Sequence, residues 1–78
     1  MNITLYTLSS CPFCVRAKQL LDSKGLKYTL HEMDTKPAEL AAAKKKYGHS
    51  TVPIVLIDDK LIGGNSELVA FAAKGGLG

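Results

Sequence analysis

The segment Ile3-Thr4-Leu5-Tyr6-Thr7-Leu8-Ser9-Ser10-Cys11-Pro12-Phe13-Cys14 carries a strand pattern that runs directly into a helix start. Its first six residues alternate between apolar and other side chains, and their β-branched and aromatic content favours a β-strand. The two serines interrupt this pattern. Pro12 suits the first turn of a helix, because the N–H group that proline lacks would have no partner there. The segment therefore predicts a strand followed by a helix, with Cys11 at the junction.

Strand and helix patterns alternate along the rest of the chain. Apolar residues recur at helical spacing after Cys14 until Gly25 ends the run. The further elements expected are a strand over 27–33, a helix over 38–47, strands over 53–57 and 60–62 joined by a tight turn at Asp58-Asp59, and a last helix capped by Asn65 or Ser66. The glycine-rich tail, 75–78, is expected to fray.

This order, β-α-β-α-β-β-α, predicts one α/β domain covering residues 1–78. A length of 78 residues permits a single domain, and 46% hydrophobic residues are enough for a compact core. A strand–helix–strand unit implies a parallel pair with a right-handed crossover, and the later hairpin adds an antiparallel pair. We expect a four-stranded mixed sheet flanked by three helices, with Cys11 at the carboxyl end of the first strand, where sites gather on open α/β sheets.

Cys11 and Cys14 are the only cysteines in the chain. A disulfide closing so small a loop would contribute about 2 kcal/mol or less, so this spacing suits chemistry better than reinforcement. A thiol attacks a disulfide as the thiolate, and the unpaired N–H groups at a helix amino terminus stabilise an anion. We expect the N–H groups of Phe13 and Cys14 to stabilise Cys11 as the nucleophile. Cys14 is then the more buried thiol that resolves the mixed disulfide.

Other roles for these residues are weaker. Two cysteines near a helix start could be merely packed. A zinc site would need His31 and His49 as its other ligands, and neither histidine has finger-type spacing from another ligand, so no metal is expected. The net charge of +3 is concentrated in Lys44-Lys45-Lys46, which lacks interleaved aromatic residues and is interpreted as a solvated helix face, not a nucleic-acid site. No signal-peptide pattern precedes the first strand, and the longest apolar run is too short to span a membrane. We expect a cytoplasmic protein, in which a lone C-x-x-C pair is usually catalytic or metal-binding.

Two later segments have features of a binding site. Thr51-Val52-Pro53 precedes an apolar strand, and a cis bond before the proline would turn the backbone groups of Val52 outward to pair with an extended peptide. Gly63-Gly64-Asn65-Ser66 leads into the last helix, whose amino terminus can bind a carboxylate. Each signal is weak alone, because most X-Pro bonds are trans and the second segment is equally a turn with a helix cap.

Together and in this order, these segments resemble glutaredoxin. Cys11-Pro12-Phe13-Cys14 is similar to the dithiol motif of that family, and Val15-Arg16-Ala17-Lys18, Thr51-Val52-Pro53, Gly63-Gly64 and Lys74-Gly75-Gly76-Leu77 look like further glutaredoxin segments. The resemblance implies a thioredoxin-like fold and an enzyme that reduces protein disulfides and glutathione mixed disulfides, with glutathione as co-substrate and no cofactor. It implies protein partners that carry disulfides or glutathione adducts, ribonucleotide reductase among the candidates. We expect a monomer that binds neither nucleic acid nor membranes.

The resemblance also implies which residues bind glutathione. The first of the later segments would pair with the backbone of the cysteinyl unit and contain a cis proline, and the second would hold the γ-glutamyl carboxylate at the helix terminus. An aromatic side chain of the dithiol motif would flank the groove. The residues implied are Phe13, Thr51, Val52, Pro53, Gly64, Asn65 and Ser66.

The chain departs from the family pattern at Leu8, where many glutaredoxins carry a lysine, and at Phe13, which replaces the usual tyrosine. By the resemblance, the first change removes a contact to the glycyl carboxylate of glutathione and some stabilisation of the thiolate. We hypothesise that Lys44–Lys46, or another base, partly substitutes. Two alternatives to a glutathione-linked reductase stay open. One is a redoxin reduced by a flavoprotein reductase, although such proteins usually carry Ser-Gly-Phe-Arg-Pro near the last turn. The other is a dimer that bridges an iron–sulfur cluster through Cys11 and glutathione, which Pro12 disfavours.

Overall fold

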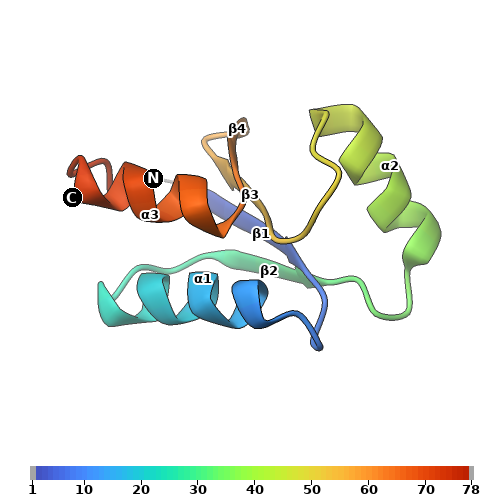
Figure 1. Ribbon diagram of the computed structural model, residues 1–78, viewed down its shortest axis with the longest axis horizontal. Coiled ribbons are helices and arrows are strands. Elements are labelled where there is room, and N and C mark those ends of the chain that lie inside the picture. Colours follow the sequence, from blue (N-terminus) through green and yellow to red (C-terminus); the bar gives the residue numbers. More distant parts are fainter. Residues whose placement is uncertain (1, 78) are drawn as a thin grey trace.

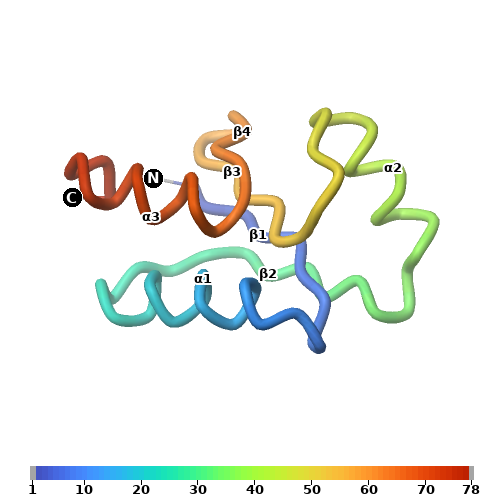
Figure 2. The backbone as a smooth tube through the Cα atoms, in the orientation of Figure 1, coloured from blue at the N-terminus to red at the C-terminus, as the bar shows by residue number. Residues whose placement is uncertain are grey.

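The computed structural model describes residues 2–77. Within them, the elements are β1 (Ile3–Thr7), α1 (Pro12–Ser23), β2 (Thr29–Glu32), α2 (Pro37–Tyr47), β3 (Ile54–Ile57), β4 (Lys60–Gly63) and α3 (Asn65–Ala73). Figure 2 follows the chain through them, from blue β1 to red α3. The predicted order of strands and helices is confirmed.

The four strands form one mixed sheet in the order β2-β1-β3-β4. β1 runs parallel to β2, with Leu5 opposite Leu30, and antiparallel to β3, with Leu5 opposite Val55. β3 and β4 pair antiparallel through a turn in which Asp58 and Asp59 both have positive φ, as a type I′ hairpin turn requires. β1 therefore lies inside the sheet, and its carboxyl end leads directly to Cys11.

The helices cover both faces of this sheet. α1 and α3 lie side by side against one face, and α2 lies apart from them against the other (Figure 1). The core under α1 and α3 consists of Ile3, Leu5, Ala17, Leu21, Val55, Ile57, Leu68 and Leu77. A second cluster under α2 consists of Met33, Leu40, Ala43, Ile54 and Leu56. Burial of this apolar surface is the main favourable contribution to folding, and it fixes the ends of β1, β3 and α3 relative to one another.

Proline and glycine mark the ends of the first two helices. Pro12 and Pro37 occupy the first turn of α1 and α2, where a missing N–H group leaves no hydrogen bond unmade. Gly48 ends α2 in the left-handed region at φ +63°, and its N–H group bonds back to the last turn. The basic residues Lys44–Lys46 lie in that last turn, where positive charge complements the helix dipole.

Several boundaries differ from the sequence expectation for local reasons. The ladder of β2 covers Thr29–Glu32, not 27–33, because only Thr4–Thr7 of β1 pair with it. Pro53 stays outside β3, consistent with a residue that has no N–H group to donate to a ladder. The expected cap of α3 by Asn65 or Ser66 is wrong, because Gly64 is the N-cap residue.

The expectation that the tail frays is also wrong for residues 75–77, and residue 78 lies outside the described residues. Leu77 is only 5% exposed and belongs to the core under α1 and α3. The N–H group of Gly76 donates to the carbonyl of Phe71 at 3.0 Å. A Cβ atom at Gly76 would lie 2.5 Å from the Phe71 ring, so the glycine allows the tail to fold back onto α3.

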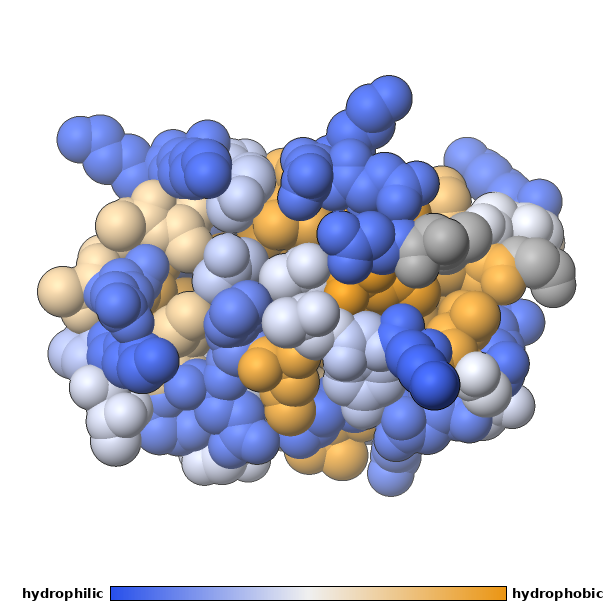
Figure 3. All heavy atoms as spheres, turned by 180° about the vertical axis from the view of Figure 1, so that it is seen from behind, coloured by the Kyte–Doolittle hydropathy of each residue, from blue (hydrophilic) through white to orange (hydrophobic). Residues whose placement is uncertain are grey.

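On the face shown in Figure 3, hydrophilic side chains surround smaller apolar areas. Among residues 2–77, no helix has both the length and the apolar character needed to cross a membrane.

Candidate active site

Cys11 lies where β1 leads into α1 and is the N-cap residue of that helix. Of the two N–H groups expected to face its sulfur, that of Cys14 makes the hydrogen bond, with 3.4 Å between the nitrogen and the Cys11 Sγ. The thiol is partly exposed, and its Sγ lies 3.7 Å from the Val52 carbonyl oxygen. A thiolate at this position would have an N–H donor, the positive end of the α1 dipole and access to a substrate.

Cys14 lies one turn further along α1 and is fully buried. Burial raises the pKa of the Cys14 thiol to about 12, with smaller upward contributions from the hydrogen bond and the charge of Cys11. The backbone of Leu8 and the charge of Lys18 act in the opposite direction. Cys14 is therefore protonated at neutral pH. The two sulfurs are free thiols with different surroundings, one at the surface and one in the core.

The turn Thr51–Pro53 packs against Cys11. The peptide bond between Val52 and Pro53 is cis, as the family resemblance implied, and Pro53 is fully buried. The hydroxyl of Thr51 lies 3.4 Å from Nε2 of His49. Through the contact of its carbonyl with Cys11, the turn presents the backbone of Val52 next to the partly exposed sulfur.

The amino terminus of α3 faces the same region. Gly64 has no side chain to cap the helix, and its own N–H group donates to Oε1 of Glu67 at 2.8 Å. Gly63 adopts φ +130°, and a Cβ atom there would lie 2.6 Å from Glu67 Cγ, so only glycine fits. Oδ1 of Asn65 is buried and has no hydrogen-bond partner among residues 2–77. The first-turn N–H groups of α3 have no partner within the helix, as at any helix start.

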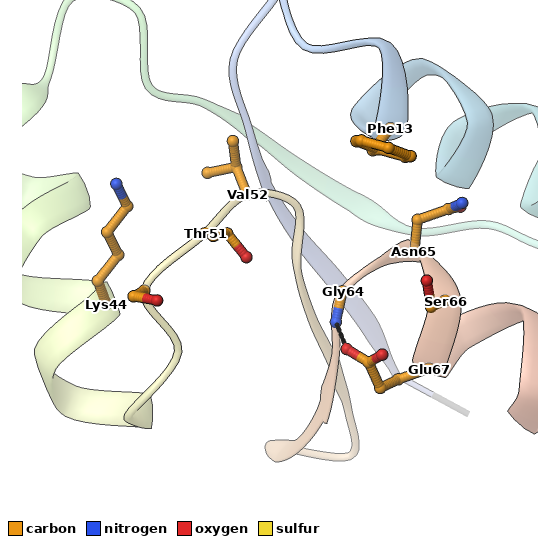
Figure 4. A pocket seen from close by; sticks show the side chains of 9 residues that line it. Phe13, Lys44, Thr51, Val52, Gly64, Asn65, Ser66 and Glu67 are labelled. Atoms are coloured by element: carbon orange, nitrogen blue, oxygen red, sulfur yellow. Dashed lines mark hydrogen bonds between the residues drawn. The ribbon is translucent and has the colours of Figure 1, made fainter.

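These elements enclose a groove of about 520 Å³ (Figure 4). Its lining residues are Phe13, Lys44, Ser50, Thr51, Val52, Gly64, Asn65, Ser66 and Glu67. The structure thus brings together every residue predicted to bind glutathione except Pro53, which lies beneath the groove. The Pro53 carbonyl comes within 3.6 Å of a Cβ position at Gly64, so the two glycine- and proline-containing turns touch. Their role in binding stays a prediction.

Three lining residues, Lys44, Ser50 and Glu67, were not assigned to glutathione binding by the family resemblance. Glu67 stands three residues after the N-cap, the spacing at which an acidic side chain can bond back to the cap, so a signal for it was present. Ser50 directly precedes Thr51. Nothing in the sequence separates Lys44 from the two lysines that follow it.

The remaining sequence candidates lie around this groove or away from it. Phe13 is 52% exposed, and the guanidinium carbon of Arg16 lies 5.5 Å from its ring centroid, a cation–π contact. His31 is not near the cysteines but stacks on Tyr6, with ring centroids 4.9 Å apart. In the part of the chain that the structure describes, no three histidine, cysteine, aspartate or glutamate side chains gather as metal ligands.

A cysteine that caps a helix, beside a cis-proline turn on a four-stranded sheet, defines a thiol–disulfide oxidoreductase of the thioredoxin-like fold. The glutaredoxin family model matches residues 3–62, and the chain belongs to the glutaredoxin family. It is 42% identical over 76 residues to glutaredoxin 3 of Escherichia coli strain K12, a match covering 97% of this chain and 92% of that protein. It is 39% identical over 75 residues to glutaredoxin of Pseudomonas aeruginosa, covering 96% of this chain and 89% of that protein.

The fold agrees with that of solved glutaredoxins. The crystal structure of the buckwheat glutaredoxin–glutathione complex superposes with a TM-score of 0.89 at 32% sequence identity, covering 96% of this chain and 71% of that one. The solution structure of glutaredoxin from Brucella melitensis gives a TM-score of 0.84 at 31% identity, covering 99% of this chain and 84% of that one.

Proposed function

We propose that this glutaredoxin is a glutathione-dependent thiol–disulfide oxidoreductase in which Cys11 is the nucleophile. The observation that carries this proposal is the position of the Cys11 sulfur. It is partly exposed at the amino terminus of α1, 3.4 Å from the N–H nitrogen of Cys14, and it borders the groove at Val52. The substrates are mixed disulfides between glutathione and a protein thiol, and disulfides within proteins.

The first step transfers the glutathionyl group to Cys11. The Cys11 thiolate attacks the glutathione sulfur of a mixed disulfide, a new bond forms between these two sulfurs, and the protein thiolate leaves and takes a proton from water. The negative charge at Cys11 is stabilised beforehand by the Cys14 N–H group and the α1 dipole. A glutathione thiolate then attacks the glutathione sulfur on Cys11. This regenerates the Cys11 thiolate and releases glutathione disulfide.

For a disulfide within a protein, Cys14 completes the exchange. Cys11 first forms a mixed disulfide with one protein sulfur and releases the other as a thiolate. Cys14 then loses its proton and attacks Cys11, which forms the Cys11–Cys14 disulfide and frees the second protein thiol. Burial keeps Cys14 protonated until then, and the charge of Cys11 raises the pKa of Cys14 further. That second contribution disappears once Cys11 is in a disulfide, so Cys14 becomes easier to deprotonate at the step that requires it.

The groove beside Cys11 is the proposed binding site for glutathione. Val52 offers its backbone to the cysteinyl unit next to the Cys11 sulfur. The first turn of α3, with Asn65 and Ser66, offers N–H groups to the γ-glutamyl carboxylate. The buried Oδ1 of Asn65 lacks a partner among residues 2–77 and suits the α-amino group of the same unit. Phe13 forms the opposite wall.

The proposed partners come from this chemistry and from the family resemblance. They are glutathione and proteins that carry glutathione adducts or reducible disulfides, with ribonucleotide reductase as one candidate. The protein works as a cytoplasmic monomer, with glutathione as co-substrate and no bound cofactor. The exposed Phe13 beside the nucleophile gives an apolar contact for the protein part of a substrate.

A comparison of electron donors tests the function. Reduction of a glutathionylated peptide is followed with the purified protein and either glutathione with glutathione reductase or thioredoxin reductase as the electron source. Turnover with glutathione is expected. Turnover with thioredoxin reductase alone would overturn the proposal in favour of a flavoprotein-reduced redoxin.

A further inference from the structure

We propose that Asp34 is a positioning residue for Cys11, because its carboxylate fixes the connection that leads from β1 into α1. The inference rests on the proposed function, in which Cys11 at the end of this connection is the nucleophile. Asp34 belongs to the next connection, from β2 to α2, and does not line the groove. Its hydrogen bonds go to Ser9, so it acts on Cys11 through the backbone.

The sheet brings the two connections together. β1 and β2 are parallel, so their carboxyl ends lie at the same edge of the sheet (Figure 1). Thr7 is opposite Glu32 in the ladder, and the N–H group of Met33 donates to the Thr7 carbonyl at 2.8 Å. Two residues beyond the last ladder pair, Ser9 and Asp34 therefore face each other.

Asp34 binds both hydrogen-bond donors of Ser9. Its Oδ1 accepts the Ser9 hydroxyl at 2.8 Å and the Ser9 N–H group at 3.1 Å, and its Oδ2 lies 3.3 Å from the same nitrogen. These bonds lower the pKa of the Asp34 carboxyl, the hydroxyl most, and the charge of Lys18 on α1 acts in the same direction. Asp34 is therefore ionised at neutral pH, and the bonds that it accepts are charge-assisted.

The segment that Asp34 fixes ends at the nucleophile. The N–H group of Cys11 donates to the Leu8 carbonyl at 3.1 Å, which closes a turn around Ser9. The same turn holds the Cys11 Sγ within 3.4 Å of the Cys14 nitrogen. A hydrogen bond weakens steeply when its geometry is disturbed, so a turn that moves freely would deprive the sulfur of this donor for part of the time. Loss of the Ser9–Asp34 contact should therefore make Cys11 less reactive.

The charge of Asp34 by itself would have the opposite effect. A nearby negative charge disfavours a thiolate, so a carboxylate that acted only through its charge would make Cys11 more reactive when removed. Asp34 is exposed, and water and salt screen its charge. We therefore expect the contact with Ser9 to outweigh the repulsion, and the direction of the change distinguishes the two effects.

The test measures the alkylation rate of Cys11 in the reduced protein. Samples treated with excess iodoacetamide at pH 7 are quenched at successive times, and mass spectrometry of the peptides gives the rate constant for Cys11 alone. In Asp34→Ala this rate constant should fall by about three- to tenfold. Its pH–rate profile should also move to higher pH, a shift that a loss of stability alone would not produce. Circular dichroism should show an intact fold, because Asp34 is at the surface.

Four variants assign the effect to the contact between the two connections. Asp34→Asn keeps an oxygen that can accept from Ser9 and should retain most of the parent rate. Ser9→Ala loses the hydroxyl bond only and should fall between the parent and Asp34→Ala. The double variant Ser9→Ala/Asp34→Ala should be no slower than Asp34→Ala, because both changes remove the same contact. Glu32→Ala removes another exposed carboxylate two residues away and is the matched control, which should behave like the parent.

Two results would overturn the inference. One is an Asp34→Ala protein whose Cys11 is alkylated at the parent rate or faster, and the other is an equal decrease in Glu32→Ala, which would trace the effect to local charge. Either result leaves the proposed function intact, because Cys11 of the parent still reacts. A parent protein whose Cys11 reacts no faster than Cys14 would instead overturn the proposed function and this inference together.

Discussion

The amino termini of α1 and α3 offer the same backbone groups but differ in the residue that caps them. Cys11 caps α1 with its own sulfur, which accepts the N–H group of Cys14. Gly64 caps α3 without a side chain, and the first turn of that helix lines an open groove. In the proposed function, the α1 terminus stabilises the nucleophile that belongs to the protein, and the α3 terminus is left for a carboxylate that the substrate brings.

The difference shows how one physical effect serves two functions. The nucleophile must stay in place through every cycle, so it is part of the chain and is buried against Val52 on one side. In the proposed function the glutathione carboxylate must leave with the product, which agrees with a cap residue, Gly64, that has no side chain to occupy the α3 terminus. Changes to one terminus should therefore affect chemistry, and changes to the other should affect substrate binding.

The largest expected effect comes from removing the proposed nucleophile at the start of α1. Cys11→Ser should lower turnover by about a thousandfold or more, because a serine hydroxyl is not a competent nucleophile at neutral pH. The assay is reduction of a glutathionylated peptide with glutathione as the donor. Circular dichroism should show an intact fold, because a hydroxyl can cap the helix in the same way as the sulfur. Substantial turnover by the variant would refute the assignment of Cys11.

A more selective loss is expected one turn further along α1. Cys14→Ser should keep the removal of glutathione from mixed disulfides, because a second glutathione can resolve the Cys11 intermediate. It should lose the reduction of disulfides within proteins, where the resolving thiol must come from Cys14. Parallel assays with a glutathionylated peptide and with a disulfide-containing protein such as insulin measure the two activities. An equal decrease in both would contradict this division of roles.

A change at the α3 terminus should affect binding and stability together. Gly63→Ala places a Cβ atom 2.6 Å from Glu67 Cγ at φ +130°, so we expect about 1–3 kcal/mol of destabilisation and a several-fold higher KM for glutathione. Urea unfolding and steady-state kinetics measure these effects. The matched control is Gly25→Ala, which also has positive φ (+67°) but has no atom within 4 Å of the new Cβ. The control should lose stability and keep its KM for glutathione. An unchanged KM in Gly63→Ala would contradict a role for Glu67 in the substrate site.

The smallest expected effect is on stability at alkaline pH. The pKa of Cys14 is raised from 9.0 to about 12 by burial, so between these values the unfolded chain loses a proton that the folded protein keeps. This group should therefore leave the free energy of unfolding unchanged below pH 9. Above pH 9 it should make the free energy of unfolding decrease as the pH rises towards 12. The pKa of Tyr28 is also raised, mainly by burial. It should therefore add to the decrease in the free energy of unfolding at alkaline pH. Urea unfolding between pH 8 and 10.5 should show a weaker decrease for Cys14→Ser than for the parent, and identical slopes would contradict the burial argument.

Most of the fold could be predicted from the sequence, because residues within each element indicate its backbone conformation. The alternation over Ile3–Leu8, Pro12 after Cys11 and the Asp58-Asp59 turn each report on their own backbone, and each prediction is confirmed. The buried tail was not accessible in this way. Leu77 is ordered by packing against residues distant in sequence, which no local pattern near 75–77 indicates.

The site was accessible in part for the same reason. The helix start at Cys11 is a local feature, and the cis bond before Pro53 came from the family resemblance. The inclusion of Lys44 in the groove depends on how α2 lies across the sheet from α3, and its two neighbours in the sequence are chemically identical to it. Only the tertiary structure distinguishes them.

The central claim is that α1 holds the Cys11 sulfur in a reactive state while Cys14 is buried and protonated, and alkylation tests it most directly. The fully reduced protein is treated at pH 7 with less than one equivalent of iodoacetamide, and the modified residue is identified by mass spectrometry of its peptides. The label should be on Cys11, with Cys14 reacting at least about ten times more slowly. Labelling of Cys14 at an equal or higher rate would contradict the account.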